Sequence, residues 1–298
     1  MIFNKLFILF KIGRKIGKSN IINIVSETHK IPLFIKIFFN FLAFSFSSSN
    51  DTKSKSKENL SESIQEMGTT FIKLGQFLAT RPDIIGEKLS KELESLQDKL
   101  PPFSKKEAEK IIIENLGQSN FDDIIDLSEP IAAASIAQVH KAKIKEDNII
   151  KNVAIKVLRP NIKKIFNDEI DAIMLLAYII ENLITKTKRL KLIEVVFLFK
   201  EITNHEMDLR FEAAAANEYA ENTKNDLGFF VPKIYWNFTS ESVLTLDWVD
   251  GVSIREKDLL KEKNIETSKI ATNLIQHFLR HAVRDGFFHA DMHQGNIF

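Results

Sequence analysis

One run of side chains in the sequence has the spacing that phosphoryl transfer needs: HADMHQGN, at residues 289–296. It fits the pattern H-x-D-x-x-x-x-N, in which a carboxylate that can accept or orient a hydroxyl proton lies five residues before an amide that can bind a metal ion. Those groups are Asp291 and Asn296. Phe287 and Phe288 precede the run and favour a segment fixed to a core over a solvated loop.

A transition-metal site is the competing interpretation of the same run. His289, Asp291 and His293 alternate, as three ligands on one face of a strand would. That interpretation gives no role to Asn296 or to Lys156, whereas phosphoryl transfer uses both. The sequence therefore favours phosphoryl transfer.

Lys156 ends a strand-like run, VAIK at residues 153–156. A lysine at the end of a strand can present its ammonium group to phosphate oxygens from a rigid element. Many surface strands also end in lysine, so this residue is weak support when taken alone.

An acidic helix is predicted over EMDLRFE, residues 206–212. Asp208 and Glu212 are four residues apart and share a helix face, while Glu206 lies nearly opposite Asp208. One of these acids could hold Lys156 in place, as a glutamate does in kinases. A solvated acidic face is the alternative. The position between the lysine strand and the 289–296 run favours the functional interpretation.

An apolar strand runs into an acidic, glycine-containing turn in LTLDWVDG, residues 244–251. Such a strand suits a connector whose backbone, around Asp247 and Val249, reads the edge of a purine. Taken alone, the segment is only a strand and a turn. The order of strand lysine, acidic helix, connector and D-x-x-x-x-N loop is the order that a kinase fold requires, and it is more specific than any one part.

The segment before the lysine strand departs from the kinase pattern. A glycine-rich loop is usual there, but this chain has PIAAASIAQVH at residues 130–140. Glycine lets backbone amides approach phosphates closely and adopt positive φ, and alanine methyl groups hinder both. We expect the segment, with Ala132, Ala133, Ala134 and Ser135, to hold a nucleotide in an altered way.

Periodicity predicts the elements that must position these groups. Helices are expected over residues 60–79, 104–117, 162–185 and 190–222, with a last helix ending near Gly286, and strands over 136–144, 152–158, 231–238 and 243–249. Ser104 and Glu107 form a capping box, and Gly117 supplies the stop of that helix. The pattern predicts an α+β, protein-kinase-like fold with an N-terminal helical extension and most of the C-terminal lobe absent.

Charge is distributed unevenly along the chain. Residues 1–57 hold ten Lys and Arg against two acidic residues, a net charge of +8, and the remainder has a net charge of −7. Because Phe, Ile and Leu are interleaved with the basic residues, we expect an anionic membrane surface and no nucleic acid as the partner.

The apolar runs 6–10 and 31–46 are too short for a signal peptide or a membrane span. An interfacial amphipathic anchor and a helical hairpin packed on the protein's own core both stay open. The absence of cysteine excludes disulfides.

Seven motifs together make the chain resemble the UbiB/ADCK family of atypical kinases from about residue 58 onward. They are K-x-G-Q at residues 73–76, TRPDIIG at 80–86, LESLQDKLPP at 93–102, the alanine-rich segment, VAIKVLRP at 153–160, the E-x-D of Glu206 and Asp208 with Glu212 following, and HADMHQGN. A chance match to all of them is negligible.

The resemblance implies a role for each matched position. Lys156 would bind nucleotide phosphates, Glu212 would pair with it, Asp291 would be the catalytic aspartate and Asn296 a metal ligand. Lys73 and Gln76 would belong to a helical extension that folds over the site and occludes protein substrates. Without the resemblance, these two residues are only polar positions on an amphipathic helix.

The resemblance also implies an ATP- and Mg²⁺-dependent kinase or ATPase that supports ubiquinone (isoprenoid quinone) biosynthesis. Its expected place is the cytoplasmic face of a bacterial inner membrane, as a peripheral protein. Membrane lipids or quinone precursors and other quinone-biosynthesis proteins are the expected partners, and a homodimer stays open. The alternative is a non-catalytic scaffold that binds nucleotide or lipid.

The expected layout has five parts: a membrane-associating segment (1–46), a linker (47–57), the K-x-G-Q extension (58–118), a kinase-like N-lobe with inserted helices (119–250) and the start of a C-lobe (251–298).

In kinase-like sites a second metal ligand, an aspartate, follows the Asn of the catalytic loop. Only Ile297 and Phe298 follow Asn296. We therefore expect the chain to be a fragment of a longer protein and to be inactive by itself.

Overall fold

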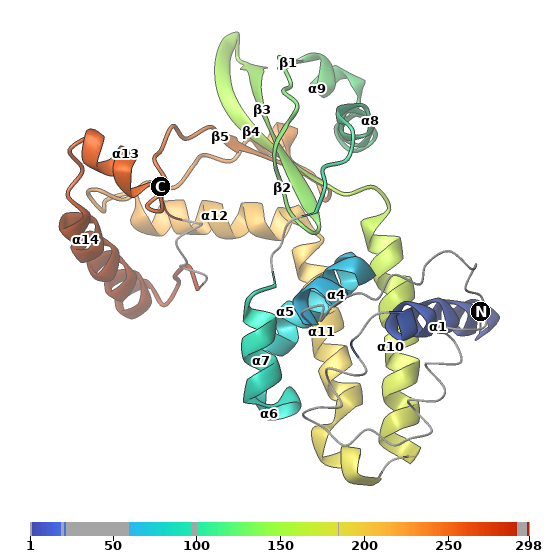
Figure 1. Ribbon diagram of the computed structural model, residues 1–298. Coiled ribbons are helices and arrows are strands. Elements are labelled where there is room, and N and C mark those ends of the chain that lie inside the picture. Colours follow the sequence, from blue (N-terminus) through green and yellow to red (C-terminus); the bar gives the residue numbers. More distant parts are fainter. Residues whose placement is uncertain are drawn as a thin grey trace. The chain divides into compact units, whose positions relative to one another are not determined.

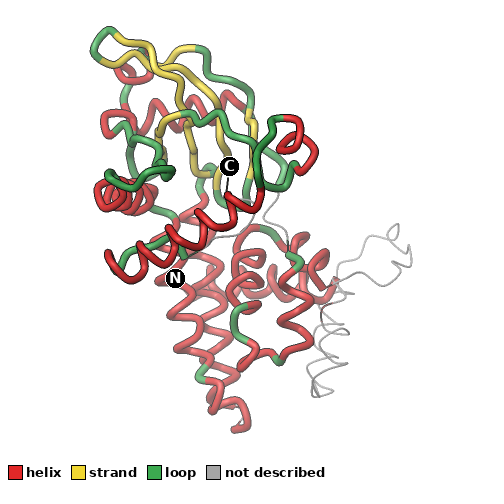
Figure 2. Tube along the Cα trace, turned by 90° about the vertical axis from the view of Figure 1, so that its left-hand side faces the viewer, coloured by secondary structure: helices red, strands yellow, loops and turns green. Residues whose placement is uncertain are grey.

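The structure, a computed structural model, describes residues 2–18, 21, 60–96, 100–183, 185–290 and 297. The chain divides into two compact units. The first contains residues 1–102, 133–137 and 158–207, and the second contains residues 103–132, 138–157 and 208–298. Figure 2 shows that the strands all fall in one sheet, while helices make up most of the remainder.

The first unit is helical (Figure 1). Its described elements are α1 (Ile2–Lys18), α4 (Leu60–Met67), α5 (Thr69–Ala79), α6 (Pro82–Ile85), α7 (Glu87–Glu94), α10 (Ile162–Leu183), the 3₁₀ helix η1 (Thr185–Leu190) and α11 (Leu192–Glu206). The helix expected over residues 162–185 is therefore present as α10. Among the described residues, no helix combines the length and the apolar character that crossing a membrane would take.

One face of α1 packs inside the first unit. Ile12 is buried in an apolar cluster with Met67 of α4, Phe71 of α5 and Ala172 of α10. The ammonium group of Lys15 donates a hydrogen bond of 2.7 Å to the carbonyl oxygen of Met67. Residues 2–18 thus pack as the helical-hairpin alternative expects, whereas the second apolar run, 31–46, lies outside the described residues.

The single helix expected over residues 60–79 is wrong, because Gly68 separates α4 from α5. Gly68 has φ 102° and ψ −177°, a backbone region that is essentially restricted to glycine. Its carbonyl oxygen accepts the first hydrogen bonds of α5, from the amides of Phe71 (3.1 Å) and Ile72 (3.0 Å). The amphipathic period continues across the break, which is why periodicity alone did not reveal it.

The second unit consists of a small sheet with flanking helices (Figure 1). Its elements are α8 (Lys105–Leu116), α9 (Gln118–Asp122), β1 (Ile124–Ile125), β2 (Pro130–Ala133), β3 (Ala137–Glu146), β4 (Ile149–Leu158), α12 (Leu209–Thr223), η2 (Trp236–Phe238), β5 (Val243–Asp247), α13 (Lys257–Glu262), α14 (Thr267–Arg280) and the π turn η3 (His281–Asp285). Gly286, at φ 65°, ends the last of these close to the expected stop.

The sheet has the strand order β1-β3-β4-β5, and β2 also pairs with β3. Asp147 and Asn148, at φ 50° and 62°, form the two-residue turn between β3 and β4. β4 and β5 run antiparallel, with Lys156 opposite Leu244. The predicted strands 136–144, 152–158 and 243–249 correspond to β3, β4 and β5.

Helix α8 covers one face of this sheet. Ile112 is fully buried in the same apolar cluster as Val153, Ile155 and Val157, which alternate along β4. Because successive strand residues point to opposite faces, this register sends Lys156 to the other side. The predicted capping box is confirmed: the Ser104 hydroxyl accepts from the amide of Glu107, whose carboxylate accepts in return.

Two predicted elements are wrong. The helix expected over residues 190–222 divides at Met207 into α11 and α12. Met207 and Leu209 are both buried, a spacing of two that a single helix face cannot provide, and the Leu209 amide bonds the carbonyl oxygen of Glu241 (3.0 Å). The strand expected over residues 231–238 is reduced to one bridge at Ile234 followed by η2, because the turn buries Tyr235 and Phe238 together.

We predict that Gly68→Ala destabilises the protein by about 1–3 kcal/mol. The added methyl group would have no neighbour closer than 3.9 Å, so the cost arises from backbone strain and not from a clash. Thermal or urea unfolding measures the effect. The matched control is Gly75→Ala in α5, where the new Cβ makes ordinary contacts at 3.4–3.6 Å and helix propensity improves. Equal loss of stability in the two variants would contradict the prediction.

Candidate functional site

The side chains of Lys156 and Glu212 meet within the second unit. The ammonium nitrogen of Lys156 lies 2.7 Å from Oε2 and 3.0 Å from Oε1 of Glu212. The lysine comes from β4 and the glutamate from the first turn of α12, 56 residues further along the chain. Of the three acids that the sequence left open as partners for Lys156, the structure selects Glu212.

This ion pair is only partly shielded from water: the side chains of Lys156 and Glu212 are 27% and 50% exposed. Ion pairs of this kind contribute about 0–1 kcal/mol to stability, so this pair stabilises the fold only slightly. A lysine held by one carboxylate and still open to solvent can receive an anionic ligand. The arrangement therefore fits phosphate binding better than it fits a purely stabilising role.

The other two acids of the predicted acidic helix lie elsewhere. Glu206 is the last residue of α11, and its carboxylate pairs with Lys73 of α5 at 2.9 Å within the first unit. Asp208 is the N-cap of α12; it accepts from the amide of Arg210 (3.1 Å) and pairs with the guanidinium group of that residue (2.7 Å). The expectation that Asp208 and Glu212 share one helix face is wrong, because Asp208 precedes the helix. Gln76 lies on α5, half-buried, one turn after Lys73.

The alanine-rich segment has its polar backbone groups engaged internally. The amide of Ala134 donates to the carbonyl oxygen of Ala137 (2.8 Å), and its own carbonyl accepts from Nε and Nη2 of Arg159 (3.1 and 2.8 Å). Ala132 is exposed, Ala133 ends β2, and Ser135 is fully buried. The amide of Ala134 thus already has an acceptor within the protein, and the altered binding of a nucleotide stays a prediction.

The predicted connector follows β5. Asp247 ends that strand; its carboxylate accepts from the hydroxyl of Tyr235 (2.6 Å) and from the amide of Lys233 (3.2 Å). Burial, together with this carboxylate, raises the pKa of Tyr235. Val249 is 44% exposed beyond the end of the strand. The side chain of Asp247 therefore fixes the neighbouring segment, and any contact with a purine falls to the backbone.

The 289–296 run lies largely outside the described residues, which include only His289 and Ala290 of it. Asp291, His293 and Asn296 are thus not placed, and the choice between a phosphoryl-transfer loop and a metal site remains a prediction from sequence. The two phenylalanines before the run differ in their surroundings. Phe287 contacts the ring of Tyr219, and Phe288 contacts Phe278 of α14.

Sequence reasoning missed a polar cluster that precedes this run. Both carboxylate oxygens of Asp226 accept from Arg284 (2.8 and 2.9 Å), and one also lies 3.0 Å from Nε2 of His281. The other imidazole nitrogen of His281 lies 2.8 Å from the hydroxyl of Tyr219. Arg280 adds a second guanidinium group at 3.6 Å from Asp226. These cations hold the pKa of Asp226 far below its ordinary value.

A metal ion does not fit this cluster, although Asp226, His277 and His281 bring three ligand atoms within 4.8 Å of one another. The Asp226 carboxylate is already neutralised by Arg284 and Arg280, and both nitrogens of His281 have partners. A cation would have to displace these groups and would be repelled by two guanidinium charges. The spacing of His277 and His281, four apart on a helix, is the one sequence signal for the cluster. Asp226 lies 51 residues earlier in the chain and gives none.

A small antiparallel sheet whose strand lysine pairs with a helix glutamate defines a protein-kinase-like α+β domain. The family model of the ABC1 atypical kinase-like domain matches residues 95–298. The chain belongs to this family of atypical kinases, which confirms the UbiB/ADCK resemblance.

Two curated relatives illustrate the match. A probable protein kinase UbiB from Marinobacter nauticus is 34% identical over 270 residues, covering 90% of this chain and 48% of the relative. One from Pseudomonas paraeruginosa is 31% identical over 292 residues, covering 97% and 54%. The chain thus spans about half the length of the curated relatives it matches. A solved complex of Rv3197 with erythromycin, from Mycobacterium tuberculosis, is 25% identical with a TM-score of 0.49, over 75% of this chain and 55% of that one.

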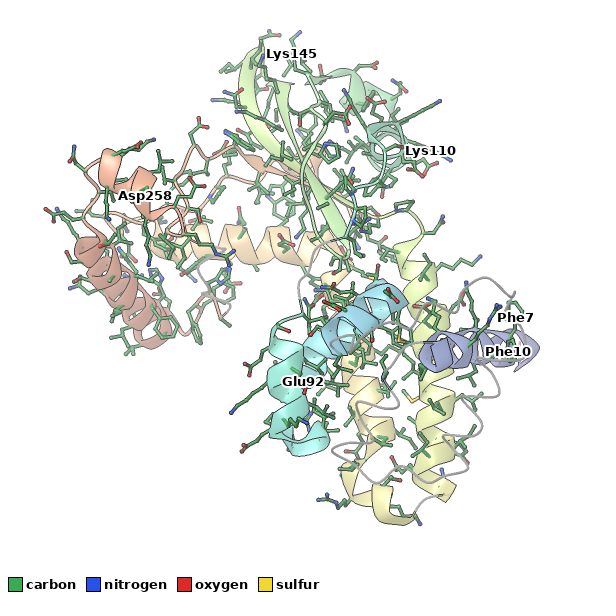
Figure 3. The ribbon with its side chains drawn as sticks, in the orientation of Figure 1. Phe7, Phe10, Glu92, Lys110, Lys145 and Asp258 are labelled. Carbon is green, nitrogen blue, oxygen red and sulfur yellow. The ribbon has the colours of Figure 1, made fainter. Side chains whose placement is uncertain are left out.

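We predict that the Asp226 cluster makes the protein acid-sensitive. A carboxylate whose pKa is lower in the folded state contributes stability above its unfolded pKa of about 3.9, and this contribution is lost as the pH falls further. Asp226→Asn should therefore be less stable than wild type at pH 7, and the difference in stability should begin to shrink once the pH falls below about 4 and continue to shrink toward the lower pKa of the folded state. The control is Asp258→Asn, an exposed carboxylate on α13 (Figure 3). A constant gap between wild type and Asp226→Asn at every pH would refute the prediction.

Proposed function

We propose that this region binds ATP with Mg²⁺ and forms part of an atypical kinase or ATPase that supports ubiquinone biosynthesis. The observation that carries the proposal is the ion pair between Lys156 and Glu212, which leaves a lysine on a rigid strand oriented and accessible. Membership of the ABC1 family, together with relatives named probable protein kinase UbiB, supports the same function.

Each side chain has a defined task in this proposal. Lys156 binds phosphate oxygens, and Glu212 fixes the direction of its ammonium group. Asp291 accepts or orients the proton of the attacking hydroxyl group or water molecule. The amide oxygen of Asn296 would hold magnesium, an ion that supplies neutralisation of the charge developing on the phosphate.

A non-catalytic scaffold that binds nucleotide or lipid is the second candidate. The observation that favours it is the hydrogen bond from the Ala134 amide to Ala137, because an amide that already has an acceptor competes poorly for phosphate. Measured turnover of ATP with and without lipid separates the two candidates.

We further propose a membrane surface as the place of action, at the cytoplasmic face of the inner membrane, with lipids or quinone precursors as partners. The exposed aromatic residues of α1 support this. Phe7 and Phe10 are 67% and 39% exposed (Figure 3), and the first 57 residues have a net charge of +8. Phenylalanine next to lysine suits an anionic lipid surface.

We predict that Lys156→Ala weakens ATP–Mg²⁺ binding by roughly 10- to 100-fold, the effect of losing a charge-assisted hydrogen bond to phosphate. A thermal-shift titration or a fluorescent ATP analogue measures the affinity. Lys151→Ala is the matched control, because it removes an exposed lysine from the same strand. Unchanged affinity in Lys156→Ala, or an equal loss in Lys151→Ala, would remove Lys156 from the site.

We predict that Phe7→Ser with Phe10→Ser reduces co-sedimentation with anionic liposomes, and that deletion of residues 1–57 abolishes it. Each basic residue near such a surface contributes on the order of 1 kcal/mol, so high salt should weaken binding as well. Phe230→Ser, which alters an exposed phenylalanine of the second unit, is the control. Equal pelleting of the deleted chain would show that residues 1–57 are not the anchor.

A further inference from the structure

Helix α12 carries two functional contacts on one face. Glu212 and Tyr219 are seven residues apart, which is two helical turns and places them above one another. Glu212 holds Lys156 at 2.7 Å. Tyr219 contacts residues that precede the HADMHQGN run.

The hydroxyl of Tyr219 lies between two groups of that later segment. It is 2.8 Å from Nδ1 of His281, and the backbone amide of His289 hydrogen-bonds it. The ring is packed as well, edge-on against Phe229 at 5.3 Å and against Phe287 at 6.1 Å between centroids. His289 is the first residue of H-x-D-x-x-x-x-N, and Asp291 follows two positions later.

The hydrogen bonds run in one direction. The carboxylate of Asp226 can only accept, so the Nε2–H group of His281 donates to it (3.0 Å). In the neutral tautomer that carries its proton on Nε2, Nδ1 accepts the hydroxyl proton of Tyr219, whose oxygen in turn accepts from the amide of His289. Every member of the chain has the partner that it needs.

The Tyr-His-Asp order has the form of a nucleophile, a base and an orienting acid. Its electrostatics point the other way. Burial raises the pKa of Tyr219, whereas an activated nucleophile needs a lowered pKa. The hydroxyl is also occupied on both sides. Tyr219 is therefore suited to hold the backbone and not to attack a substrate.

The backbone that leads to His289 has an unusual conformation. His281–Asp285 form a π turn, and such turns are rare and frequently occur at functional sites. From this turn His281 and Arg284 both reach Asp226, which lies just beyond the end of α12. The π turn is thus hydrogen-bonded to Tyr219 of α12 and to Asp226, which follows that helix.

We propose that Tyr219 is a positioning residue that fixes the start of the H-x-D loop to α12, the helix whose Glu212 holds the phosphate-binding lysine. The helix then connects the partner of Lys156 with His289, the first residue of that loop, along its own rigid length. This inference rests on the proposed phosphoryl-transfer function for its purpose, although the contact itself does not depend on it.

Tyr219→Phe tests the contact, because it removes the hydroxyl and keeps the ring that packs on Phe229 and Phe287. Hydrogen–deuterium exchange followed by mass spectrometry should show amides of residues 286–297 exchanging roughly two- to tenfold faster, the range that one lost neutral hydrogen bond allows. Tyr235→Phe is the control for losing a buried hydroxyl, since its partner is Asp247. The inference fails if exchange in 286–297 is unchanged, or if Tyr235→Phe accelerates it equally.

Kinetics of the full-length protein that carries this region provide the second readout. Tyr219→Phe should lower kcat for ATP and leave KM for ATP within about twofold, because Lys156 and Glu212 are untouched. Tyr178→Phe, an exposed tyrosine on α10, should change neither. A rise in KM with kcat unchanged would overturn the positioning role. If wild type shows no turnover, the proposed function fails while the exchange result still decides whether Tyr219 holds the loop.

Discussion

The arrangement of the second unit brings the ammonium group of Lys156 and the carboxylate of Glu212 together in an ion pair. Lys156 can reach α12 only because Val153, Ile155 and Val157 are buried on the opposite face of β4. Glu212 can meet it only because α12 begins where it does. The negative charge lies in the first turn of that helix, where the macrodipole favours an acid. The pair is worth little as stabilisation, about 0–1 kcal/mol, so the fold itself does not depend on it.

Much of this was predictable from residue patterns that are local. The alternation along β3 and β4, the capping box at Ser104 and the long apolar helix α10 are each determined by neighbours in sequence, and each was found. The breaks at Gly68 and Met207 were not. Both lie inside a continuous helical period, and the second is stabilised by a hydrogen bond from Leu209 to Glu241, a partner that only the tertiary structure supplies. The same holds for the site: the strand lysine could be recognised, but its partner depended on where α12 starts.

The alanine-rich segment shows how the chain combines retained chemistry with restraint. A glycine loop would leave amides free to surround phosphate. Here Arg159 donates to the carbonyl oxygens of Leu100, Pro101 and Ala134, while the amide of Ala134 donates to Ala137. The guanidinium group has five donors in a fixed, planar arrangement, so one arginine can hold several carbonyl oxygens at once. The segment therefore has an amide and a carbonyl group of Ala134 that are already hydrogen-bonded within the protein.

The polar cluster beyond α12 holds the π turn that precedes the 289–296 run. The side chain of Asp226 is 6% exposed. Arg280, His281 and Arg284 contact its carboxylate directly. Tyr219 of α12 extends the network through its hydrogen bond with His281. A buried carboxylate that loses its partners carries a large desolvation penalty, so partial detachment of the π turn is disfavoured. Because α12 bears both Glu212 and Tyr219, any movement of this helix must shift the partner of Lys156 and the partner of His281 together.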